Sequence, residues 1–390
     1  MKILMLTHEF PPFRGGIGTY SCQLARAAHE IGHEVTVVAP DFGQDLTAPD
    51  RLTYPVTVER YRAGTYNFRR LPFVVARTWR ESRRRDYDIL HAVDPSYTLA
   101  LAFLNHLKRI EFVATAHGTE ILALRTSKQA RILRTGDLFD RAAVVFTNSE
   151  FTRSLLIQHC PRVDIARVRV TQLGVDPFWF GAGEKSEQVR TSLGIPVGNR
   201  VILTVARLDE RKGHETVLKA VAQLSDQLKA KLTYMIVGSE SDRAYTRKLR
   251  DLAATCGAEV RFISGISNEE LRNLYGCADL FCMPGEVHPK RVEGFGLAYL
   301  EAAAQGLASI GSRAGAVPEV VLHGKTGLLI EPGNSTELAG YLTRALTDDA
   351  YRRALGEKAK EWARSFTWRR CAEQTYGSAG AGRFMQEQDQ

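Results

Sequence analysis

Two glutamates beside a glycine-rich turn are the residues in this sequence whose types and spacing best fit a chemical role. Glu293 and Glu301 lie eight residues apart, and Glu293 opens the run EGFG at residues 293–296. An apolar run at 280–283 precedes this turn and predicts a buried strand, and a helical pattern through Ala304 follows it. The amides of such a turn and helix start can hold an anion. Carboxylates beside that cradle can accept hydrogen bonds from a vicinal diol, so the combination fits a sugar nucleotide. A plain strand-helix unit with two surface glutamates is the alternative.

Two cations follow another predicted strand, at residues 201–205. Arg207 and Lys212 lie in the run ARLDERKG directly after it. Ligands of parallel sheets bind at the carboxyl ends of strands. An arginine fork and a lysine point charge there suit a diphosphate that gains negative charge as a glycosidic bond breaks. Solvated surface charges are the alternative.

The first half of the chain has two candidates of its own. The run GGIG, which includes Gly15 and Gly16, lies between the first predicted strand and the first predicted helix. Its amides could approach a diphosphate with no Cβ in the way, although it lacks the Gly-x-Gly-x-x-Gly dinucleotide pattern. His117 ends a predicted strand at 112–116 and should face the ligand edge. A simple tight turn and a structural histidine are the alternatives.

Strand and helix patterns alternate almost throughout, which predicts parallel sheets covered by helices on both faces. A clear helix is predicted at 19–31, a capping box begins another helix at Ser267, and residues 335–362 are helical by pattern. Residues 174–199 are rich in glycine and proline and predict an interdomain linker. The tail after Tyr376 is predicted to be disordered. Strands are predicted at 3–6, 35–39, 89–92, 112–116, 144–147 and 168–172, and then at 201–205, 232–237, 260–263, 280–283, 308–311 and 327–330.

In chain order, the elements GGIG, His117-Gly118, Arg207 with Lys212-Gly213, Val237-Gly238 and EGFG with Glu301 resemble the motifs of one enzyme family. These are the retaining GT-B glycosyltransferases of the large bacterial mannosyltransferase and glycogen-synthase-like family, glycosyltransferase family four. The resemblance covers residues 1 to about 370. It implies an α/β fold of the GT-B type, with two doubly wound Rossmann-like domains facing across a cleft. The expected domains are an acceptor domain at 1–180, completed by a crossover helix at about 365–380, and a donor domain at 181–364.

The same resemblance implies roles for individual residues. Glu301 would hold the ribose hydroxyls of the nucleotide, and Glu293 would lie near the transferred sugar. The predicted catalytic residues are His117, Arg207, Lys212 and Glu293. The predicted donor-binding residues are Gly15, Gly16, Gly238, Ile263, Gly294, Phe295, Gly296, Leu297 and Glu301. The donor would be GDP- or UDP-linked, with no other cofactor and no metal, because an Asp-x-Asp metal motif is absent. Alternatives are a GT-B-shaped binding protein without turnover, and an epimerase or phosphorylase of the same fold.

One departure concerns the acceptor. The link at residues 285–292 is longer than is common in the family, and it resembles the link of mannosyltransferases that act on phosphatidylinositol mannosides. A glycan or lipid-linked acceptor is therefore expected, in the synthesis of cell-surface polysaccharide or glycolipid. A small soluble glycoside is the alternative product.

Length and composition bound these interpretations. With 390 residues, the chain is too long for one ordinary core, and 44% apolar with 25% charged residues describes a soluble globular protein. No apolar run approaches the ~20 residues of a membrane span. Six cysteines without a Cys-x-x-Cys pair predict neither a zinc site nor a disulfide framework, so a cytoplasmic location is expected. The net charge of +8 favours anionic partners, and nucleic-acid-binding signatures are absent.

A cluster of basic residues offers a surface for such a partner. Between residues 68 and 85 there are seven arginines, and Pro72 marks the start of a predicted helix. Arg77, Arg80 and Arg84 share one face of that helix, while Val75 and Trp79 lie on another. The segment Arg69–Arg85 could rest on an anionic membrane as a peripheral contact. A solvated helix that packs Val75 and Trp79 on the domain is the alternative.

Overall fold

The structure is a computed structural model that describes residues 1–64, 68–84, 86–126, 138–183, 186–240 and 242–377. It separates into two compact units, Met1–Gly174 with Thr367–Gln390 (unit 1) and Val175–Phe366 (unit 2). The sequence placed these boundaries after residues 180 and 364. The segment Pro177–Phe180 belongs to unit 2, because the Trp179 ring packs edge-on against Tyr275 there at 5.8 Å. The predicted disordered tail and Arg85 lie outside the described residues.

Unit 1 is built on a parallel sheet of seven strands in the order β3-β2-β1-β4-β5-β6-β7. Chain order reverses direction beside β1, which makes the sheet doubly wound. Apolar side chains fill both faces, as parallel sheets require. Six of the seven strands were predicted, with ends that differ by at most a few residues. The strands are β1 (Lys2–Leu6), β2 (Glu34–Pro40), β3 (Thr57–Tyr61), β4 (Ile89–Ala92), β5 (Val113–Ala116), β6 (Val144–Thr147) and β7 (Val168–Val170).

The missed strand, β3, lies at the edge of the sheet. Its sequence TVERY is only partly buried, and two of its charged residues make contacts beside the sheet. Arg60 is paired with Asp50 at 2.7 Å, and Glu59 is paired with Arg84 at 2.8 Å. Edge strands tolerate such residues, so the run lacks the continuous apolar pattern of a central strand.

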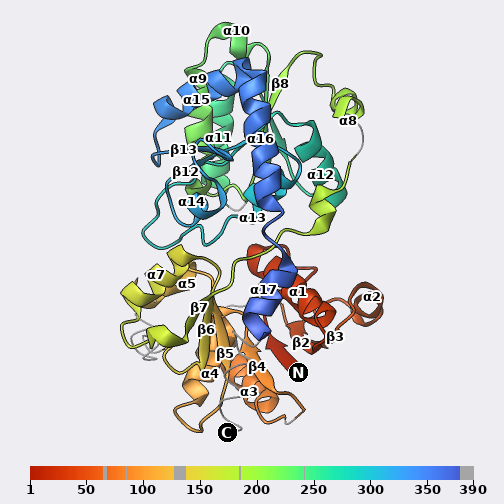
Figure 1. Cartoon of the computed structure of the whole chain (residues 1–390), viewed down its shortest axis with the longest axis vertical. Helices are drawn as coiled ribbons and strands as arrows, with labels where there is room; N and C mark the ends of the chain where they lie inside the picture. The colour runs from red at the N-terminus through yellow and green to blue at the C-terminus, as the bar shows by residue number, and fades with distance from the viewer. Residues whose placement is uncertain (65–67, 85, 127–137, 184–185, 241, 378–390) are drawn as a thin grey trace. The chain divides into compact units, whose positions relative to one another are not determined.

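Helices cover both faces of the sheet in unit 1. Helix α1 (Gly16–Glu30) and helix α17 (Trp368–Tyr376) lie side by side, red and blue in Figure 1. Helices α3 (Leu71–Glu81) and α4 (Pro95–Leu104) pack together and contribute to a core cluster on the opposite face. The other helices in the described part of unit 1 are α2 (Thr47–Thr53), α5 (Thr119–Thr126) and α7 (Glu150–His159).

Helix α17 is tied into unit 1 although it follows unit 2 in the sequence. The Tyr376 hydroxyl lies 2.6 Å from Nδ1 of the buried His91 on β4. On the other side of the imidazole, Nε2 is 2.8 Å from the Thr115 hydroxyl on β5. Burial lowers the pKa of His91 to about 3, so the ring is neutral and joins helix to sheet by hydrogen bonds alone.

Helix α1 begins earlier than predicted, at Gly16 instead of residue 19, so most of the GGIG run belongs to its first turn. Gly15 is the N-cap. A Cβ at Gly18 would lie 2.9 Å from the carbonyl oxygen of Phe13, which explains why glycine occupies a helical position there. The pattern hid this start because glycines usually mark turns rather than helices.

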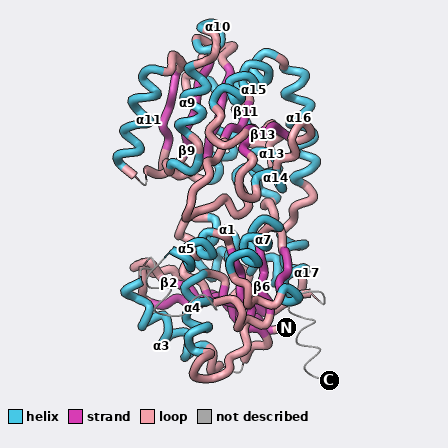
Figure 2. Tube along the Cα trace, turned by 90° about the vertical axis from the view of Figure 1, so that its left-hand side faces the viewer, coloured by secondary structure: helices cyan, strands magenta, loops and turns pink. Residues whose placement is uncertain are grey.

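Unit 2 contains a second parallel sheet, of six strands in the order β10-β9-β8-β11-β12-β13. All six strands were predicted. Figure 2 shows them between helices such as α11 (Arg243–Thr255) and α16 (Asp349–Ala363). The doubly wound topology of both sheets confirms the expected α/β fold. The strands are β8 (Arg200–Val205), β9 (Leu232–Val237), β10 (Glu259–Ile263), β11 (Leu280–Cys282), β12 (Ser309–Ser312) and β13 (Gly327–Ile330).

The helices of unit 2 include the predicted capping box, in which Ser267 and Glu270 satisfy each other at the start of α12. The predicted helical segment 335–362 consists of two helices, because Asp348 ends α15 and caps α16 by accepting from the Tyr351 amide. The other helices are α8 (Ser186–Ser192), α9 (His214–Ala222), α10 (Asp226–Lys229), α12 (Asn268–Cys277), α13 (Leu297–Ala304), α14 (Val317–Val320) and α15 (Ser335–Thr347).

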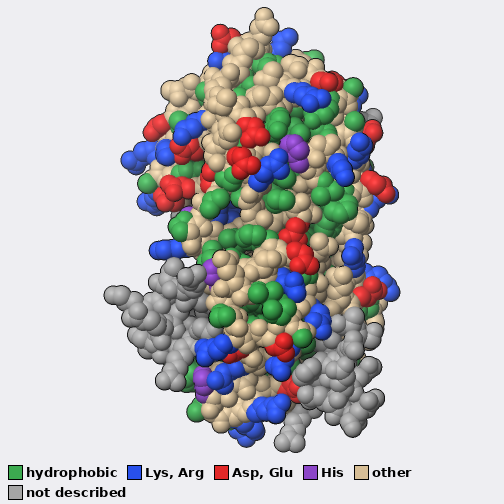
Figure 3. All heavy atoms as spheres, turned by 60° about the vertical axis from the view of Figure 1, so that its left-hand side comes forward, with side chains coloured by type: hydrophobic (Ala, Val, Ile, Leu, Met, Phe, Trp, Pro, Cys, Tyr) green, Lys and Arg blue, Asp and Glu red, His purple; other side chains and the backbone are tan. Residues whose placement is uncertain are grey.

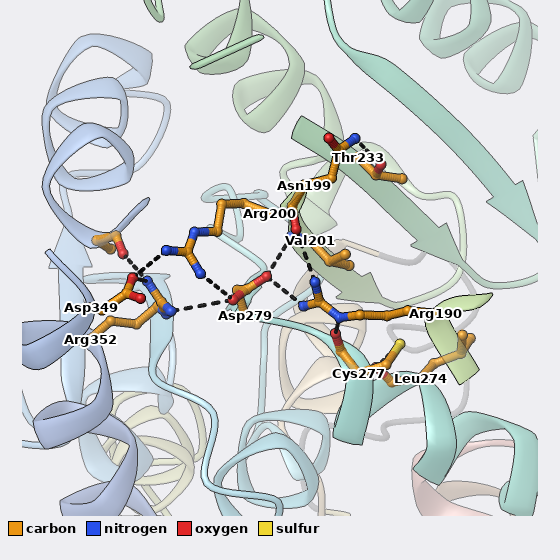
Figure 4. A network of polar contacts seen from close by, with 11 residues as sticks. Arg190, Asn199, Arg200, Val201, Thr233, Leu274, Cys277, Asp279, Asp349 and Arg352 are labelled. Carbon is orange, nitrogen blue, oxygen red and sulfur yellow. Dashed lines mark hydrogen bonds and ion pairs between the residues drawn. The ribbon is translucent and has the colours of Figure 1, made fainter. Parts of the chain in front are cut away.

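The amino-terminal edge of this sheet is held by a network around Asp279, which directly precedes β11 (Figure 4). Its carboxylate accepts from Arg190 and from the Val201 amide at 2.7 and 2.8 Å. Arg200 and Arg352 approach it at 3.2 and 3.3 Å. The network therefore joins α8, β8, β11 and α16.

Candidate active site

The described residues of unit 2 bring Lys212 and Glu293 into direct contact at the carboxyl edge of the sheet. Lys212 ends a short 3-10 turn after β8, and Glu293 lies in the loop between β11 and α13. The Lys212 ammonium donates to Oε2 of Glu293 at 2.5 Å, and Arg211 approaches the same oxygen at 3.3 Å. Burial raises the pKa of Glu293, but the charges of Lys212 and Arg211 outweigh it and hold that pKa below its ordinary value. Glu293 is thus an anion between two cations.

Arg211 was missed by the sequence analysis, which chose Arg207 from the same loop. Arg211 is 9% exposed, and its guanidinium also donates to the carbonyl of Val292 at 3.0 Å. Arg207 is exposed, and in the described structure the hydrogen bonds and ion pairs of the Glu293 carboxylate come from Arg211 and Lys212. Both arginines follow the same strand, so only the path of the turn decides which one meets Glu293.

The long link at 285–292 folds back over the loop that follows β8. Arg291 donates to Asp209 at 2.6 Å, and the amide of Glu286 donates to the carbonyl of Arg211 at 2.8 Å. These contacts fix the loop that carries Lys212 against the loop that carries Glu293. The link therefore helps to align two of the predicted site residues.

Glu301 lies on α13, where the Tyr275 hydroxyl of α12 donates to its Oε2 at 3.0 Å. Burial raises the pKa of Glu301 to about 7, against the smaller opposing effect of that hydrogen bond. Near neutral pH, the carboxyl group is therefore poised between its neutral and charged forms. Charged, it can accept hydrogen bonds from two hydroxyl groups of a ligand; Glu293 is already committed to cations.

The predicted glycines of unit 2 lie where backbones approach closely. A Cβ at Gly238, after β9, would lie 1.9 Å from the carbonyl oxygen of Ala206. The amide of Gly238 donates to the carbonyl of Ile263 at the end of β10, at 2.9 Å. Gly296 has φ +98° and forms the N-cap of α13, a conformation that favours glycine.

The rest of the EGFG run surrounds this helix start. Leu297 is the first residue of α13, and Gly294 follows Glu293 in the loop. Phe295 is 3% exposed and packs edge-on against Phe366 at 6.0 Å. Its side chain therefore belongs to the core, and only the backbone of Phe295 can serve a ligand alongside Glu293.

His117 lies at the carboxyl end of β5 in unit 1, as expected. Its Nε2 is 2.8 Å from the carbonyl oxygen of Val93, which can only accept, so Nε2 carries the proton. The Tyr20 ring meets the imidazole edge-on at 5.2 Å. Both contacts fix the ring, and Nδ1 is the nitrogen left to accept from a hydroxyl group.

A second histidine cluster at this edge was not predicted. His8 follows β1, and Nδ1 of its ring lies 2.7 Å from the Ser96 hydroxyl, while the Asp94 carboxylate accepts from the amides of His8 and Ser96. All three residues are at most 5% exposed. Burial lowers the pKa of His8 against the opposing charge of Asp94. In the sequence, the HAVDP run after β4 was the signal that could have pointed to Asp94.

The arginines in and directly after α3 form ion pairs within unit 1, which a row of arginines facing lipid would not do. Arg77, Arg80 and Arg84 all approach Glu81, whose side chain is 1% exposed, at 2.8, 3.3 and 3.4 Å. Arg77 is only 12% exposed, so it is not available to a membrane surface. Val75 and Trp79 pack against the core, as the alternative interpretation of this segment held. Arg69, Arg80 and Arg83 remain exposed, and Figure 3 shows basic side chains interspersed with acidic and apolar ones on the face drawn.

No group of three or more His, Cys, Asp or Glu side chains in the described residues is placed to hold a metal ion. None of the helices in the described part of the chain is long and apolar enough to cross a membrane.

Both halves of the chain are similar in sequence to known protein families. Residues 14–178 match the family described as Glycosyltransferase Family 4, and residues 185–362 match Glycosyl transferases group 1. The D-inositol 3-phosphate glycosyltransferase of Corynebacterium efficiens is 31% identical over 307 residues, covering 74% of this chain and 70% of its own. The chain belongs to glycosyltransferase family 4. It is therefore a transferase, and the predicted family is confirmed.

This family 4 member is also similar to a mycobacterial enzyme in sequence and to a solved structure in fold. A GDP-mannose-dependent alpha-(1-6)-phosphatidylinositol monomannoside mannosyltransferase of Mycobacterium tuberculosis is 28% identical over 94% of both chains. The structure of HepE from Anabaena, in complex with UDP and glucose, has a TM-score of 0.79 at 22% identity, covering 97% of this chain and 99% of that one. The second likeness supports the GT-B fold.

Proposed function

We propose that this family 4 enzyme moves a hexosyl unit from a GDP- or UDP-linked sugar to a hydroxyl acceptor, with retention of the anomeric configuration. The observation that carries the proposal is the Glu293 cluster at the carboxyl edge of unit 2. Glu293 neutralises one of the charges of Lys212 and Arg211, and the exposed Arg207 adds another nearby in sequence. The remaining positive charge suits a diphosphate leaving group.

In this proposal, the nucleotide lies along the carboxyl edge of unit 2. The Glu301 carboxylate accepts the ribose hydroxyls, the amides at residues 294–297 and Gly238 approach the donor, and Arg207 with Lys212 meets the diphosphate. From unit 1, Gly15 and Gly16 offer amides, and Nδ1 of His117 accepts from a sugar hydroxyl. The leaving phosphate takes the acceptor proton, so the protein acts by positioning and by stabilising charge.

A metal ion is not required in this proposal, because Arg207 and Lys212 supply the positive charge that a cation would bring. Activity should then persist in EDTA. Complete loss on chelation, restored by Mn²⁺ or Mg²⁺, would overturn this part of the proposal.

The proposed acceptor is lipid-linked, and the proposed location is cytoplasmic and peripheral to the membrane. The M. tuberculosis relative, whose printed name includes a phosphatidylinositol monomannoside, supports this class of acceptor. Arg69, Arg80 and Arg83 would provide the contact with anionic lipid, at roughly 1 kcal/mol for each side chain near the surface. A soluble glycoside remains the alternative product.

The direct test is a panel of nucleotide sugars read by thermal shift, followed by transfer assays with the sugar that binds. Proton NMR of the product or of the hydrolysed donor gives the anomeric configuration. A stabilising nucleotide sugar whose anomer is retained is the expected result. Inversion of the anomer, or the absence of any stabilising nucleotide sugar, would contradict the proposal.

A further inference from the structure

A cavity of about 510 Å³ opens at the carboxyl ends of β2 and β3 in unit 1. Its walls come from the turn after β2, the turn after β3, and the start of α3. None of the residues assigned above to the donor lines it. The cavity lies at the edge of the sheet where ligands of parallel sheets bind.

Two arginines make the cavity basic. Arg62 and Arg70 are both exposed, and neither guanidinium makes an ion pair or hydrogen bond with another residue in the described ranges. Three other arginines of unit 1, Arg60, Arg77 and Arg84, are each paired with a carboxylate. Two neighbouring guanidinium groups without a counter-ion favour a bound anion.

The acidic residue in the wall does not cancel this charge by pairing with either arginine. Oδ1 of Asp41 accepts from the amides of Gly43 and Ala63, at 2.9 and 3.2 Å. Asp41 therefore ties the turn after β2 to the turn after β3. The charge of Arg70 is also felt at His8. Burial is the main cause that lowers the pKa of His8, the charge of Asp94 opposes it, and the charge of Arg70 lowers that pKa further.

Aromatic rings form the apolar part of the cavity. Phe73 is 48% exposed, and its ring lies 5.9 Å from that of Tyr61. Phe42 has φ +53°, a left-handed conformation that is strained for a phenylalanine. Its ring stacks on Phe13 at 5.9 Å, and Phe13 in turn approaches within 3.0 Å of the position of a Cβ on Gly15. The strained residue thus connects the cavity to the glycine-rich start of α1.

We propose that this cavity binds a phosphate group, as a monoester or diester, carried by the acceptor substrate. Arg62 and Arg70 hold the phosphate oxygens, and Phe42 and Phe73 pack against the carbon skeleton that bears the phosphate. The assignment to the acceptor rests on the proposed glycosyl transfer; the assignment of a phosphate to the cavity does not. The source of the phosphate is either a soluble phosphorylated polyol or the headgroup of a phospholipid.

The first test measures direct binding by NMR titration. Glycerol 1-phosphate is the probe, and glycerol is its neutral counterpart. Glycerol 1-phosphate should bind and glycerol should not. Arg62→Ala and Arg70→Ala should each weaken binding about tenfold, because each removes a charge-assisted contact. Arg62→Lys should retain part of the affinity, and circular dichroism melts identify any variant that does not fold.

The matched control is the double variant Arg51→Ala/Arg109→Ala, which removes the same charge as Arg62→Ala/Arg70→Ala from exposed positions on unit 1 that do not line this cavity. It should bind glycerol 1-phosphate as the unaltered chain does. Equal affinity in the unaltered chain and in Arg62→Ala/Arg70→Ala would overturn the proposal and leave the two arginines as solvated charges.

Vesicles of phosphatidylglycerol distinguish the two sources of the same chemical group. Loss of sedimentation in Arg62→Ala/Arg70→Ala, but not in the control pair, supports a phospholipid headgroup. Binding of soluble glycerol 1-phosphate without any effect of Arg62→Ala/Arg70→Ala on sedimentation supports a soluble acceptor. Failure of both probes to bind the unaltered chain contradicts the site.

The transfer assay separates this proposal from the proposed function. In Arg62→Ala, the KM for a phosphorylated acceptor should rise about tenfold, while hydrolysis of the nucleotide sugar in its absence stays unchanged. If no nucleotide sugar binds but glycerol 1-phosphate does, glycosyl transfer fails and the phosphate site stands. If transfer proceeds equally well to phosphorylated and neutral acceptors, the phosphate site fails and glycosyl transfer stands.

Discussion

Two carboxylates of unit 2 are each surrounded by cations, Asp279 at the amino-terminal ends of the strands and Glu293 at their carboxyl ends. Asp279 directly precedes β11, and Glu293 follows it after the loop 283–292, so the two carboxylates lie at opposite ends of that strand. Asp279 is 9% exposed and meets three arginines and an amide (Figure 4). Glu293 is 21% exposed and meets one lysine and one arginine.

The difference lies in how completely each set of polar groups is satisfied. Around Asp279, Asp349 pairs with two of the same arginines, at 2.5 and 2.8 Å, which closes the network. Around Glu293, the buried Nε of Arg211 has no hydrogen-bond partner in the described structure. A closed network holds elements together, whereas an incompletely satisfied and more exposed one is suited to receive a ligand.

Removing the acid from the closed network should have the largest effect. Asp279→Ala leaves the Val201 amide without its acceptor, and it takes one of two carboxylates from Arg352, which is 6% exposed. We expect the free energy of unfolding to fall by about 3 kcal/mol, as measured by urea denaturation. Asp226→Ala is the control, because Asp226 is 99% exposed and should change stability little. An unchanged midpoint for Asp279→Ala would show that the network does not hold the amino-terminal edge.

At the open cluster, the effect should be on catalysis instead. Lys212→Ala and Arg207→Ala should each lower the rate of transfer about a hundredfold or more, because each removes a charge from the leaving diphosphate. Their thermal unfolding should stay close to that of the unaltered chain, since Arg211 still pairs with Glu293. Lys219→Ala, at an exposed surface pair, is the control. Near-normal turnover in Lys212→Ala would reject its place at the donor.

The pH dependence of Glu301 should separate stability from binding. The folded chain holds its proton up to about pH 7, against an ordinary pKa of 4.5, so its contribution to stability is complete below pH 4.5 and is lost as pH rises through 7. Glu301→Gln should then raise the free energy of unfolding at pH 8 by about 1 kcal/mol, a value reduced for partial exposure to solvent.

Nucleotide binding should change in the opposite direction. Affinity of the unaltered chain should increase as pH rises through 7, because the charged carboxylate is the better acceptor for ribose hydroxyls, and Glu301→Gln should lose this dependence. Calorimetric titrations with GDP and UDP at pH 6 and pH 8 measure it. Affinities that do not vary with pH would remove Glu301 from the ribose site.

The smallest effect is expected at the long link. Arg291→Ala breaks an ion pair with Asp209 in which the arginine is 53% exposed. Exposed pairs contribute little, so the free energy of unfolding should change by less than about 1 kcal/mol. Any loss in transfer rate should be small beside that of Lys212→Ala, and a hundredfold loss would show that the link itself acts in the reaction.

The sequence predicted the central strands well, because parallel strands buried on both faces read as apolar runs. It did not predict β3, whose charged side chains find partners at the sheet edge, nor the break at Asp348, where a cap divides a continuous helical pattern. A single capping residue is easily missed within a helical pattern that continues on both sides of it.

At the candidate site, the sequence identified Lys212 with Glu293 but not the contact of Arg211 with the same carboxylate. It also missed the contacts of Asp94 with His8 and Ser96, which depend on two separate strand ends lying together. It assigned Arg77 to a lipid-facing row, whereas the chain uses that arginine against the buried Glu81. Local pattern tells which loops face a ligand edge, and tertiary packing decides which of several like residues points inward.

The hydrogen bond between Tyr376 and His91 also bears on how the chain is made. Unit 1 is completed by α17, which follows residues 175–366 in the sequence. The first 174 residues are therefore synthesised before α17, the helix that packs on α1. Unit 2 can complete its sheet while unit 1 still waits for that helix. Synthesis thus finishes the second half first, and a fragment that stops at Gly174 would expose the face of α1 that α17 covers.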